Sequence, residues 1–431
     1  NYNKVVIAAH HFFITICAAC GSGGMEVYMQ NILDYLDWRG DISFATDGFN
    51  EVDNLIMSVL SYLEFEGVVS QGAGQDPKSL FEAAIQYKEN MNKLPSNNHN
   101  QFLRSVPKLL FKAAQLSGYE NQIDYEESKQ FSAIVFSIDN DQHFIAFRGT
   151  DDTIIGWQED FQMSFMDEVH AQKQAVIYVN KICSNLSGKF YFGGHSKGGN
   201  LAVYAAIHAD EKVRDRIVAI YNNDGPGFLP NTIHSEEYQS MLEKITTMIP
   251  KSSVVGMLLE HEEEYKVVNS NETGIMQHDA FSWEVKGTEF VYEECLTKNS
   301  LTLNSTVRAW LSQLSVEERK SFVKALFDII KGTGAKTIGE LSKEKLLAAN
   351  AMIKAYKNMD ELTQSHLKKT IELFFIESQK TLKDSINEDI NTLRIRQKYI
   401  KQNLIKKVDL KKYKLKHVNK RPAELHKDET I

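Results

Sequence analysis

The sequence predicts an α/β fold with a mostly parallel central sheet and a helical C-terminal extension. Strand-like segments alternate with helical segments between residues 131 and 268, which is typical of parallel sheets covered by helices on both faces. After about residue 300 the strand-like segments stop and apolar residues recur with helical spacing. We therefore expect a leader at 1–28, an α/β domain with a helical N-terminal part at 29–300, and the helical extension at 301–431.

The length and composition suit one large globular domain with an appendage. Single domains rarely exceed about 250–300 residues, and this chain has 431. Apolar residues at 42% and charged residues at 25% exclude wholesale disorder. Four cysteines are too few for a disulfide framework, and we interpret the lone C-x-x-C of Cys17 and Cys20 as chance rather than a metal or redox site. We expect no metal and no cofactor.

The first residues have an unusual pattern. Residues 5–19 are apolar and small residues follow, which resembles a weak secretion or lipoprotein signal. His10 and His11 interrupt the apolar run, and Met25 or Met29 would be a natural start. We favour a non-native leader and a cytoplasmic protein, whereas a working signal would mean export or membrane association.

The residue pattern in the first half of the α/β domain predicts helices followed by a β-hairpin. Asn50, with Asp53 three residues later, is typical of a helix N-terminus. Helices are expected at 78–93 and 99–116, and two strands joined by a turn at 131–138 and 143–148.

The second half predicts strands separated by helices, and the extension predicts helices alone. Ser315 and Glu318 form a capping box at the start of one of these helices. Strands are expected at 189–193, 217–222, 244–249 and 265–268, and helices at 167–186, from residue 200 to 209, and at 315–330, 342–357 and 360–407.

A glycine-rich turn carries the central chemical signal. It follows strand 189–193, precedes a helix, and reads Gly194-His195-Ser196-Lys197-Gly198-Gly199. A G-x-S-x-G pattern alone is weak, but the strand–turn–helix setting is that of a nucleophile elbow, which exposes a serine at the top of the sheet. The sequence therefore predicts Ser196 as a nucleophile on an α/β-hydrolase fold.

The geometry of such a turn explains the residues around the serine. A sharp turn brings strand and helix backbones together, so Gly194 and Gly198 must lack a Cβ atom. The N-terminus of the helix offers unpaired N–H groups. We expect the N–H of Lys197 to bind a developing oxyanion.

A second segment gives a family resemblance. The sequence Phe-Arg-Gly-Thr stands at 147–150, and Trp157 and Asp160 form a W-x-x-D pattern. Together with the glycine-rich turn, these motifs resemble the fungal-type (class 3) lipases, α/β hydrolases that cleave lipid esters. The resemblance implies that the N–H of Thr150 is the other oxyanion donor.

The whole chain resembles still more closely a group of bacterial lipase-like proteins, the Mbeg-like branch, whose function is not established. These proteins share the segment at 31–36 and the lysine after the serine. His170 matches a recurring position of the lipase pattern, and the resemblance implies a structural role for it.

His278 is the predicted base. In this fold the order along the chain is Ser, then Asp or Glu, then His. Of the histidines after Ser196, His208 lies in the helix behind the nucleophile and His234 precedes the remaining strands, with His261 a further candidate. His278 lies in a loop after the last strand, where the fold places its base.

Asp224, directly after strand 217–222, is the predicted acid. The fungal-type lipases carry their acid one strand later, where this sequence has no carboxylate at 249–253. Either the acid moves to Asp224, with Glu260 a poorer alternative, or the triad is weakened. An Asp-Gly pair is also ordinary turn chemistry.

Two features near the motif leave alternatives open. Lipases usually carry an apolar residue where this chain has Lys197, and a lysine here either attracts an anionic headgroup or acyl substrate, or pairs with a nearby carboxylate.

An apolar cluster follows the Phe-Arg-Gly-Thr segment and contains Trp157, Phe161, Met163, Phe165 and Met166. It forms either a lid or acyl-binding wall, or a helix face packed on the core.

The charge is unevenly distributed. The chain carries −8, but residues 394–421 hold twelve basic residues and one acidic residue, so this segment is +11 and the remainder −19. The segment either contacts an anionic membrane surface or is a solvated helix end that partners the acidic body. Without a phosphate loop or nucleic-acid motif, we expect no nucleic-acid partner.

These residues predict a serine hydrolase that cleaves carboxylic esters, of lipids in particular, through an acyl-enzyme on Ser196. In this prediction His278 accepts the serine proton, Asp224 orients His278, and the N–H groups of Thr150 and Lys197 bind the oxyanion. One alternative is a catalytically weakened binding or scaffold protein on the same fold. Another is an acyltransferase, since the same triad serves an acceptor other than water.

Overall fold

The computed structural model describes residues 30–90, 114–139, 141–151, 153–343 and 345–381. The chain divides into two compact units, Asn1–Phe375 and Ile376–Ile431, and the elements below all lie in the first. The predicted leader, the cysteine pair and the basic segment lie outside the described residues, as do large parts of the helices expected at 99–116 and 360–407.

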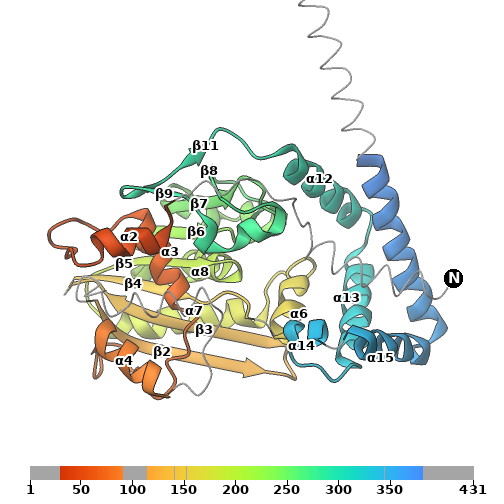
Figure 1. The fold of residues 1–431 in the computed structure, drawn as a ribbon, viewed down its shortest axis with the longest axis horizontal. Coiled ribbons are helices and arrows are strands. Elements are labelled where there is room, and N and C mark those ends of the chain that lie inside the picture. The colour runs from red at the N-terminus through yellow and green to blue at the C-terminus, as the bar shows by residue number, and fades with distance from the viewer. Residues whose placement is uncertain (1–29, 91–113, 140, 152, 344, 382–431) are drawn as a thin grey trace, which may run out of the picture. The chain divides into compact units, whose positions relative to one another are not determined.

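A nine-stranded sheet forms the centre of the first unit, in the order β1-β2-β3-β4-β5-β6-β7-β8-β11 (Figure 1). Strands β4 to β8 are parallel and lie in chain order, and antiparallel strands flank them on both sides. The strands are β1 (Lys78–Ser79), β2 (Gln115–Asp124), β3 (Lys129–Ser137), β4 (Gln142–Phe147), β5 (Lys189–His195), β6 (Ile217–Asn223), β7 (Ile245–Pro250), β8 (Tyr265–Val268) and β11 (Tyr292–Glu293).

The strands expected from the alternating pattern are present. The expected hairpin is the antiparallel pair β3 and β4, in which Ile134 lies opposite Ala146. The later strands are β5, β6, β7 and β8, and β8 has the bounds that the sequence predicts. The parallel segment therefore follows directly from the strand and helix periods of the sequence.

Strand β2 was not predicted, and the end of the helix expected at 99–116 is wrong where β2 begins. The strand has no apolar alternation, and Gly118 with φ +64° interrupts it. Its pairing with β3 shifts register between Ser117 and Glu120. The neighbouring strand, rather than the local sequence, decides the conformation here.

Helices cover both faces of the sheet, because alternate residues of each strand point to opposite sides. On one face Leu55 and Ile56 of α3 (Glu51–Leu60) share a core with Phe144. On the other face α7 (His170–Asn185) and α8 (Lys197–His208) form a second core. The expected capping box at the start of α3 is present.

The helices after residue 297 form a third core together with α6 (Ile154–Gln162), which comes from the α/β part (Figure 1). Trp157 and Phe161 of α6 pack against this core, and the expected capping box of Ser315 and Glu318 is present. The boundary near residue 300 stays a prediction. The helices include α12 (Lys298–Ser312), α13 (Val316–Lys331), α14 (Ile338–Lys343) and α15 (Lys345–Asn358). Residues 361–375 are helical as well, as the start of the helix expected at 360–407 predicts, and they supply Leu367, Ile371 and Phe374 to this core.

The chain therefore has an α/β-hydrolase fold, with a mostly parallel central sheet and a helical C-terminal extension. The parallel strands bring the ends of β4, β5 and β6 to one edge, where reactive groups of such sheets gather. Within the described ranges, no helix is both long and apolar enough to cross a lipid bilayer.

Candidate active site

The predicted nucleophile lies in a strained turn. Strand β5 ends at His195, helix α8 begins at Lys197, and Ser196 between them has φ +58° and ψ −135°. Residues with a side chain rarely adopt a positive φ, and such strain is concentrated at functional sites. The turn therefore has the geometry of a nucleophile elbow.

The glycines beside the serine are a steric requirement of this turn. A Cβ atom on Gly194 would lie 2.2 Å from the carbonyl carbon of Gly198, and one on Gly198 would lie 2.1 Å from the Phe147 oxygen. Both contacts are with backbone, which has no rotamer by which to move away. The glycines thus let β4, β5 and α8 meet at the serine.

His278 and Asp224 form a close pair. Asp224 follows β6 directly, and His278 ends a short 3₁₀ helix, η5 (Gly274–His278), after β8. The Nδ1 atom of His278 donates to Oδ2 of Asp224 over 2.6 Å, and the Asp224 side chain is fully buried. This bond leaves Nε2 of His278 as the atom available for proton transfer.

The other carboxylate oxygen of Asp224 is also held. Oδ1 accepts a hydrogen bond of 2.5 Å from the Ser253 hydroxyl and one of 3.1 Å from the Gly256 N–H. Ser253 stands in the loop after β7, where fungal-type lipases carry their acid. In this chain that loop supports a carboxylate from β6 instead of supplying one.

His278 and Ser196 line the same cavity, which has a volume of about 520 Å³. Among the described residues, neither the Ser196 hydroxyl nor Nε2 of His278 has a hydrogen-bond partner, and distances between catalytic groups often shorten only when substrate binds. The other candidate bases lie elsewhere: His261 bonds Glu263 and the Gly256 carbonyl, and the ring of His208 contacts Tyr204. His234 follows the short helix Pro230–Ile233.

His195 is a site residue that sequence reasoning missed. Its Nε2–H donates to the His278 carbonyl over 2.7 Å, and the two imidazole rings lie 4.6 Å apart. The hydroxyl of Tyr62 lies 3.3 Å from Nδ1 of His195. Burial lowers the pKa of His195 to about 3, so its ring stays neutral beside His278. The only sequence signal was its place before Ser196.

Thr150, a predicted oxyanion donor, is fixed by Asp160. Its hydroxyl donates to both carboxylate oxygens of Asp160, at 2.7 and 2.8 Å. Burial raises the pKa of the Asp160 carboxyl to about 6, although the charge of Lys197 and the bond from Thr150 act in the opposite direction. The W-x-x-D pattern thus brings a carboxylate of α6 to the end of β4.

The contacts of Lys197 decide between the two roles that the sequence allowed for its side chain, attraction of an anionic substrate and pairing with a carboxylate. Its side chain is 1% exposed, and its ammonium group donates to Oε2 of Glu159 at 3.0 Å, and to the side-chain and backbone oxygens of Gln130 at 2.9 and 3.1 Å. Three donors meet three acceptors, so the lysine pairs with a carboxylate. The hypothesis that this ammonium attracts an anionic substrate is wrong, because no donor is left for one.

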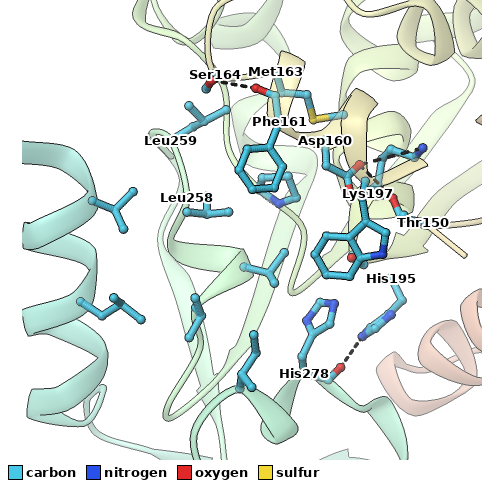
Figure 2. Close-up of a pocket in the computed structure, with 18 of the residues that line it drawn as sticks. Thr150, Asp160, Phe161, Met163, Ser164, His195, Lys197, Leu258, Leu259 and His278 are labelled. Carbon is cyan, nitrogen blue, oxygen red and sulfur yellow. Dashed lines mark hydrogen bonds and ion pairs between the residues drawn. The ribbon is translucent and has the colours of Figure 1, made fainter. Parts of the chain in front are cut away.

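The apolar cluster at and after α6 packs on the core, as one alternative expected, and some of its members also line the cavity; a lid or acyl-binding role stays a prediction. Phe161 and Met163 line the cavity (Figure 2), and so does Trp157. Trp157, Phe161 and Phe165 also pack against the C-terminal helices. His170, at the start of α7, bonds the Glu127 carbonyl at 2.6 Å, as a structural residue would.

The rest of the cavity wall is largely apolar and comes from three further segments. Loop residues after β7 and the residues around η5 form two sides, and α12 and α13 form another. Apolar lining residues from these segments are Val254, Val255, Leu258, Leu259, Ile275, Met276, Ala280, Phe281, Leu303, Val307, Trp310, Leu311, Leu314, Phe322 and Val323.

Comparisons with known proteins place this site in a family. A search of curated proteins finds no match. Among solved structures, that of M37 lipase matches with 14% sequence identity and a TM-score of 0.27, over 47% of this chain and 68% of the lipase. The family model described as Mbeg1-like matches residues 107–328, which include Ser196, Asp224 and His278. The chain belongs to the Mbeg1-like family.

Proposed function

We propose that the protein is a serine hydrolase that cleaves carboxylic esters through an acyl-enzyme on Ser196. The observation that carries the proposal is the 2.6 Å bond between His278 and a buried carboxylate, at a cavity that the strained serine also lines. A serine nucleophile needs a base, and the base needs an acceptor at its other nitrogen. Asp224 accepts the hydrogen bond from Nδ1 of His278.

In the first step the Ser196 oxygen attacks the ester carbonyl carbon. His278 takes the serine proton at Nε2, and the carbonyl oxygen becomes an oxyanion that the N–H groups of Thr150 and Lys197 bind. Asp224 stabilises the imidazolium that forms. The C–O bond to the leaving alcohol then breaks, and the alcohol oxygen takes the proton from Nε2.

In the second step water attacks the acyl-enzyme and gives its proton to His278. The acid leaves, and the proton returns to Ser196. The side-chain bonds of Thr150 and Lys197 to the consecutive residues Asp160 and Glu159 support their role in oxyanion binding, because they fix both donors before reaction.

The apolar cavity wall supports an ester of a lipid acyl chain as substrate. Each methylene group that leaves water for an apolar site gains about 0.8 kcal/mol. A non-catalytic protein on the same fold was considered because the sequence has no carboxylate after β7. That reason no longer applies, because Asp224, directly after β6, contacts His278.

A fluorophosphonate probe tests the proposal directly. Ser196 is expected to become phosphonylated with loss of fluoride, and Ser196→Ala is expected to abolish labelling and lower ester turnover by about 10⁴-fold or more. Ser164→Ala is the matched control, because Ser164 lines the same cavity but donates to the Phe161 carbonyl. A folded wild-type protein that stays unlabelled would favour the scaffold alternative.

Added alcohols separate hydrolysis from acyl transfer. The lining of the cavity favours neither water nor an alcohol as the acceptor of the acyl group. Both reactions pass through the same acyl-enzyme on Ser196. If a new ester forms faster than free acid in the presence of an alcohol, the protein is an acyltransferase. Free acid as the main product supports the hydrolase.

A further inference from the structure

Arg319 places a cation at the wall of the predominantly apolar cavity. It stands in the first turn of α13 and lines the cavity. Its Nη1 donates to the Ser164 carbonyl at 2.8 Å, and its Nε and Nη2 donate to the Leu311 carbonyl at 3.2 and 2.7 Å. These carbonyls lie at the C-terminal ends of α6 and α12, so the guanidinium ties both helices to α13.

The charge of this guanidinium is not matched by a carboxylate. A guanidinium has five N–H donors, and three of them are used here. Burial lowers the pKa of Arg319, and no charged side chain of the described residues contributes to this shift. Lys197, the other cation at the cavity, has all three donors satisfied. Arg319 therefore retains two donors and a full charge for a further partner.

The guanidinium lies away from the reacting groups. Figure 2 draws Ser164 and His278 on opposite sides of the group of lining residues, with Phe161 and Leu258 between them. Because Arg319 is bonded to Ser164, it belongs to the far end. The Asp160 carboxylate lines the cavity near Thr150 and would repel an anion at the reactive end. An anionic group is thus favoured at one end of the cavity only.

We propose that the substrate is an ester with an anionic group, a carboxylate or a phosphate, at the end remote from the reacting carbonyl, and that Arg319 binds this group. The inference rests on the proposed function and adds the substrate class. A planar guanidinium binds either anion through paired N–H donors. The apolar wall between Ser196 and Arg319 then holds the hydrocarbon that joins the two ends.

Paired substrates test this specificity. One pair is the p-nitrophenyl monoester of dodecanedioic acid and p-nitrophenyl dodecanoate, which places a carboxylate on the acyl side. The other pair is an oleoyl lysophosphatidic acid and monooleoylglycerol, in which the phosphate stands on the glycerol close to the ester rather than remote from it. This second pair is expected to have an anionic-to-neutral ratio of kcat/KM near one, and the first pair a ratio well above one.

Arg319→Gln is expected to lower that ratio by about tenfold or more, since hydrogen bonds to charged groups are strong ones. A change of kcat/KM on the neutral ester would show that the substitution has disturbed the ends of α6 and α12 rather than anion binding alone. Arg308→Gln is the matched control, because Arg308 also donates to a carbonyl, that of Leu259, but it does not line the cavity. For the first pair, a ratio that is near one in the wild type, or unchanged in Arg319→Gln, overturns the proposal.

A binding experiment keeps this inference separable from the hydrolase proposal. In the Ser196→Ala protein, decyl phosphate is expected to bind at least about tenfold more tightly than decanol, and Arg319→Gln should remove the difference. Equal binding of the two probes overturns the anion site whatever the activity. Selective binding in a protein that turns over no ester keeps the site and rejects the hydrolase. If Arg319→Gln fails to fold, Arg319→Lys, which keeps the charge, should retain part of the preference.

Discussion

The Nδ1 atom of His278 lies 2.6 Å from Oδ2 of Asp224, although 54 residues separate the two along the chain. Asp224 directly follows strand β6, and His278 is the last residue of a short 3₁₀ helix after β8. The pairing therefore depends on the order of parallel strands in the sheet. The carboxylate that contacts His278 thus follows the strand before the one after which the fungal-type lipases carry their acid.

Asp224→Asn is expected to lower kcat by about 10³–10⁴-fold, because an amide in place of the carboxylate favours the wrong histidine tautomer and does not stabilise the imidazolium. Ester turnover and unfolding by urea should be measured on the same preparation. Glu260→Gln is the control, since Glu260 was the other candidate acid, and it should retain wild-type turnover. An Asp224→Asn protein that is folded and fully active would exclude Asp224 as the acid.

Gly194→Ala is expected to prevent formation of the serine turn. The added Cβ atom would lie 2.2 Å from the Gly198 carbonyl carbon, and backbone must shift to relieve the contact. We expect a loss of about 3 kcal/mol or more in the free energy of unfolding, or no folded protein at all. The control is Gly48→Ala, where nothing lies within 4 Å of the new atom. Equal unfolding midpoints for the two variants would contradict the steric reading.

The third prediction concerns the stability that the buried ion pair between Lys197 and Glu159 contributes. Lys197→Met leaves a fully buried carboxylate without its cation, which typically costs about 3–5 kcal/mol of stability. The double variant with Glu159→Gln should regain part of the loss, because no buried charge remains. Urea unfolding measures both effects.

An exposed pair provides the comparison for that experiment. Lys324 pairs with Asp328 on the surface of α13, with 76% and 47% of the two side chains exposed. Lys324→Met should change the free energy of unfolding by about 0.5 kcal/mol or less. If Lys197→Met costs no more than this, the buried pair does not stabilise the fold.

The local parts of the site could be predicted from the sequence. The turn around Ser196 depends on glycines two residues away, and the strand and helix beside it have clear periods. Asp224 and His278 were predicted from the order of groups that the fold imposes, and the structure brings these two side chains together. Each of these inferences needed only chain order and the ends of strands.

The parts that depend on packing between distant segments could not be predicted. Lys197 left two alternatives open until Glu159, 38 residues away, was placed beside it. The bond of His195 to the His278 carbonyl requires the position of a loop 83 residues later. For Arg319 the sequence indicated only the start of a helix, because the cavity wall is formed by helices whose relative positions no periodicity specifies.

Asp160 predicts how stability depends on pH. Its pKa is raised from 3.8 to about 6 in the folded protein, chiefly by burial. Between these two values the folded state binds the proton more tightly than the unfolded state does, so the contribution of this group to stability falls as pH rises from 4 to 6. Above pH 6 the carboxylate is charged in both states, and its contribution stays at the lower level.

Asp160→Asn isolates this contribution, because the amide is neutral at every pH. The stability of the variant minus that of the wild type, from urea unfolding, should rise by about 1–3 kcal/mol between pH 4 and pH 6 and then stay constant. Asp328→Asn, at an exposed position, is the control and should lack this rise. A difference that is flat across the range, or that falls with pH, would mean that burial does not dominate the Asp160 carboxyl. A rise of the expected sign would mean that the Asp160 charge lowers stability at the position where this carboxylate holds Thr150, the proposed oxyanion donor.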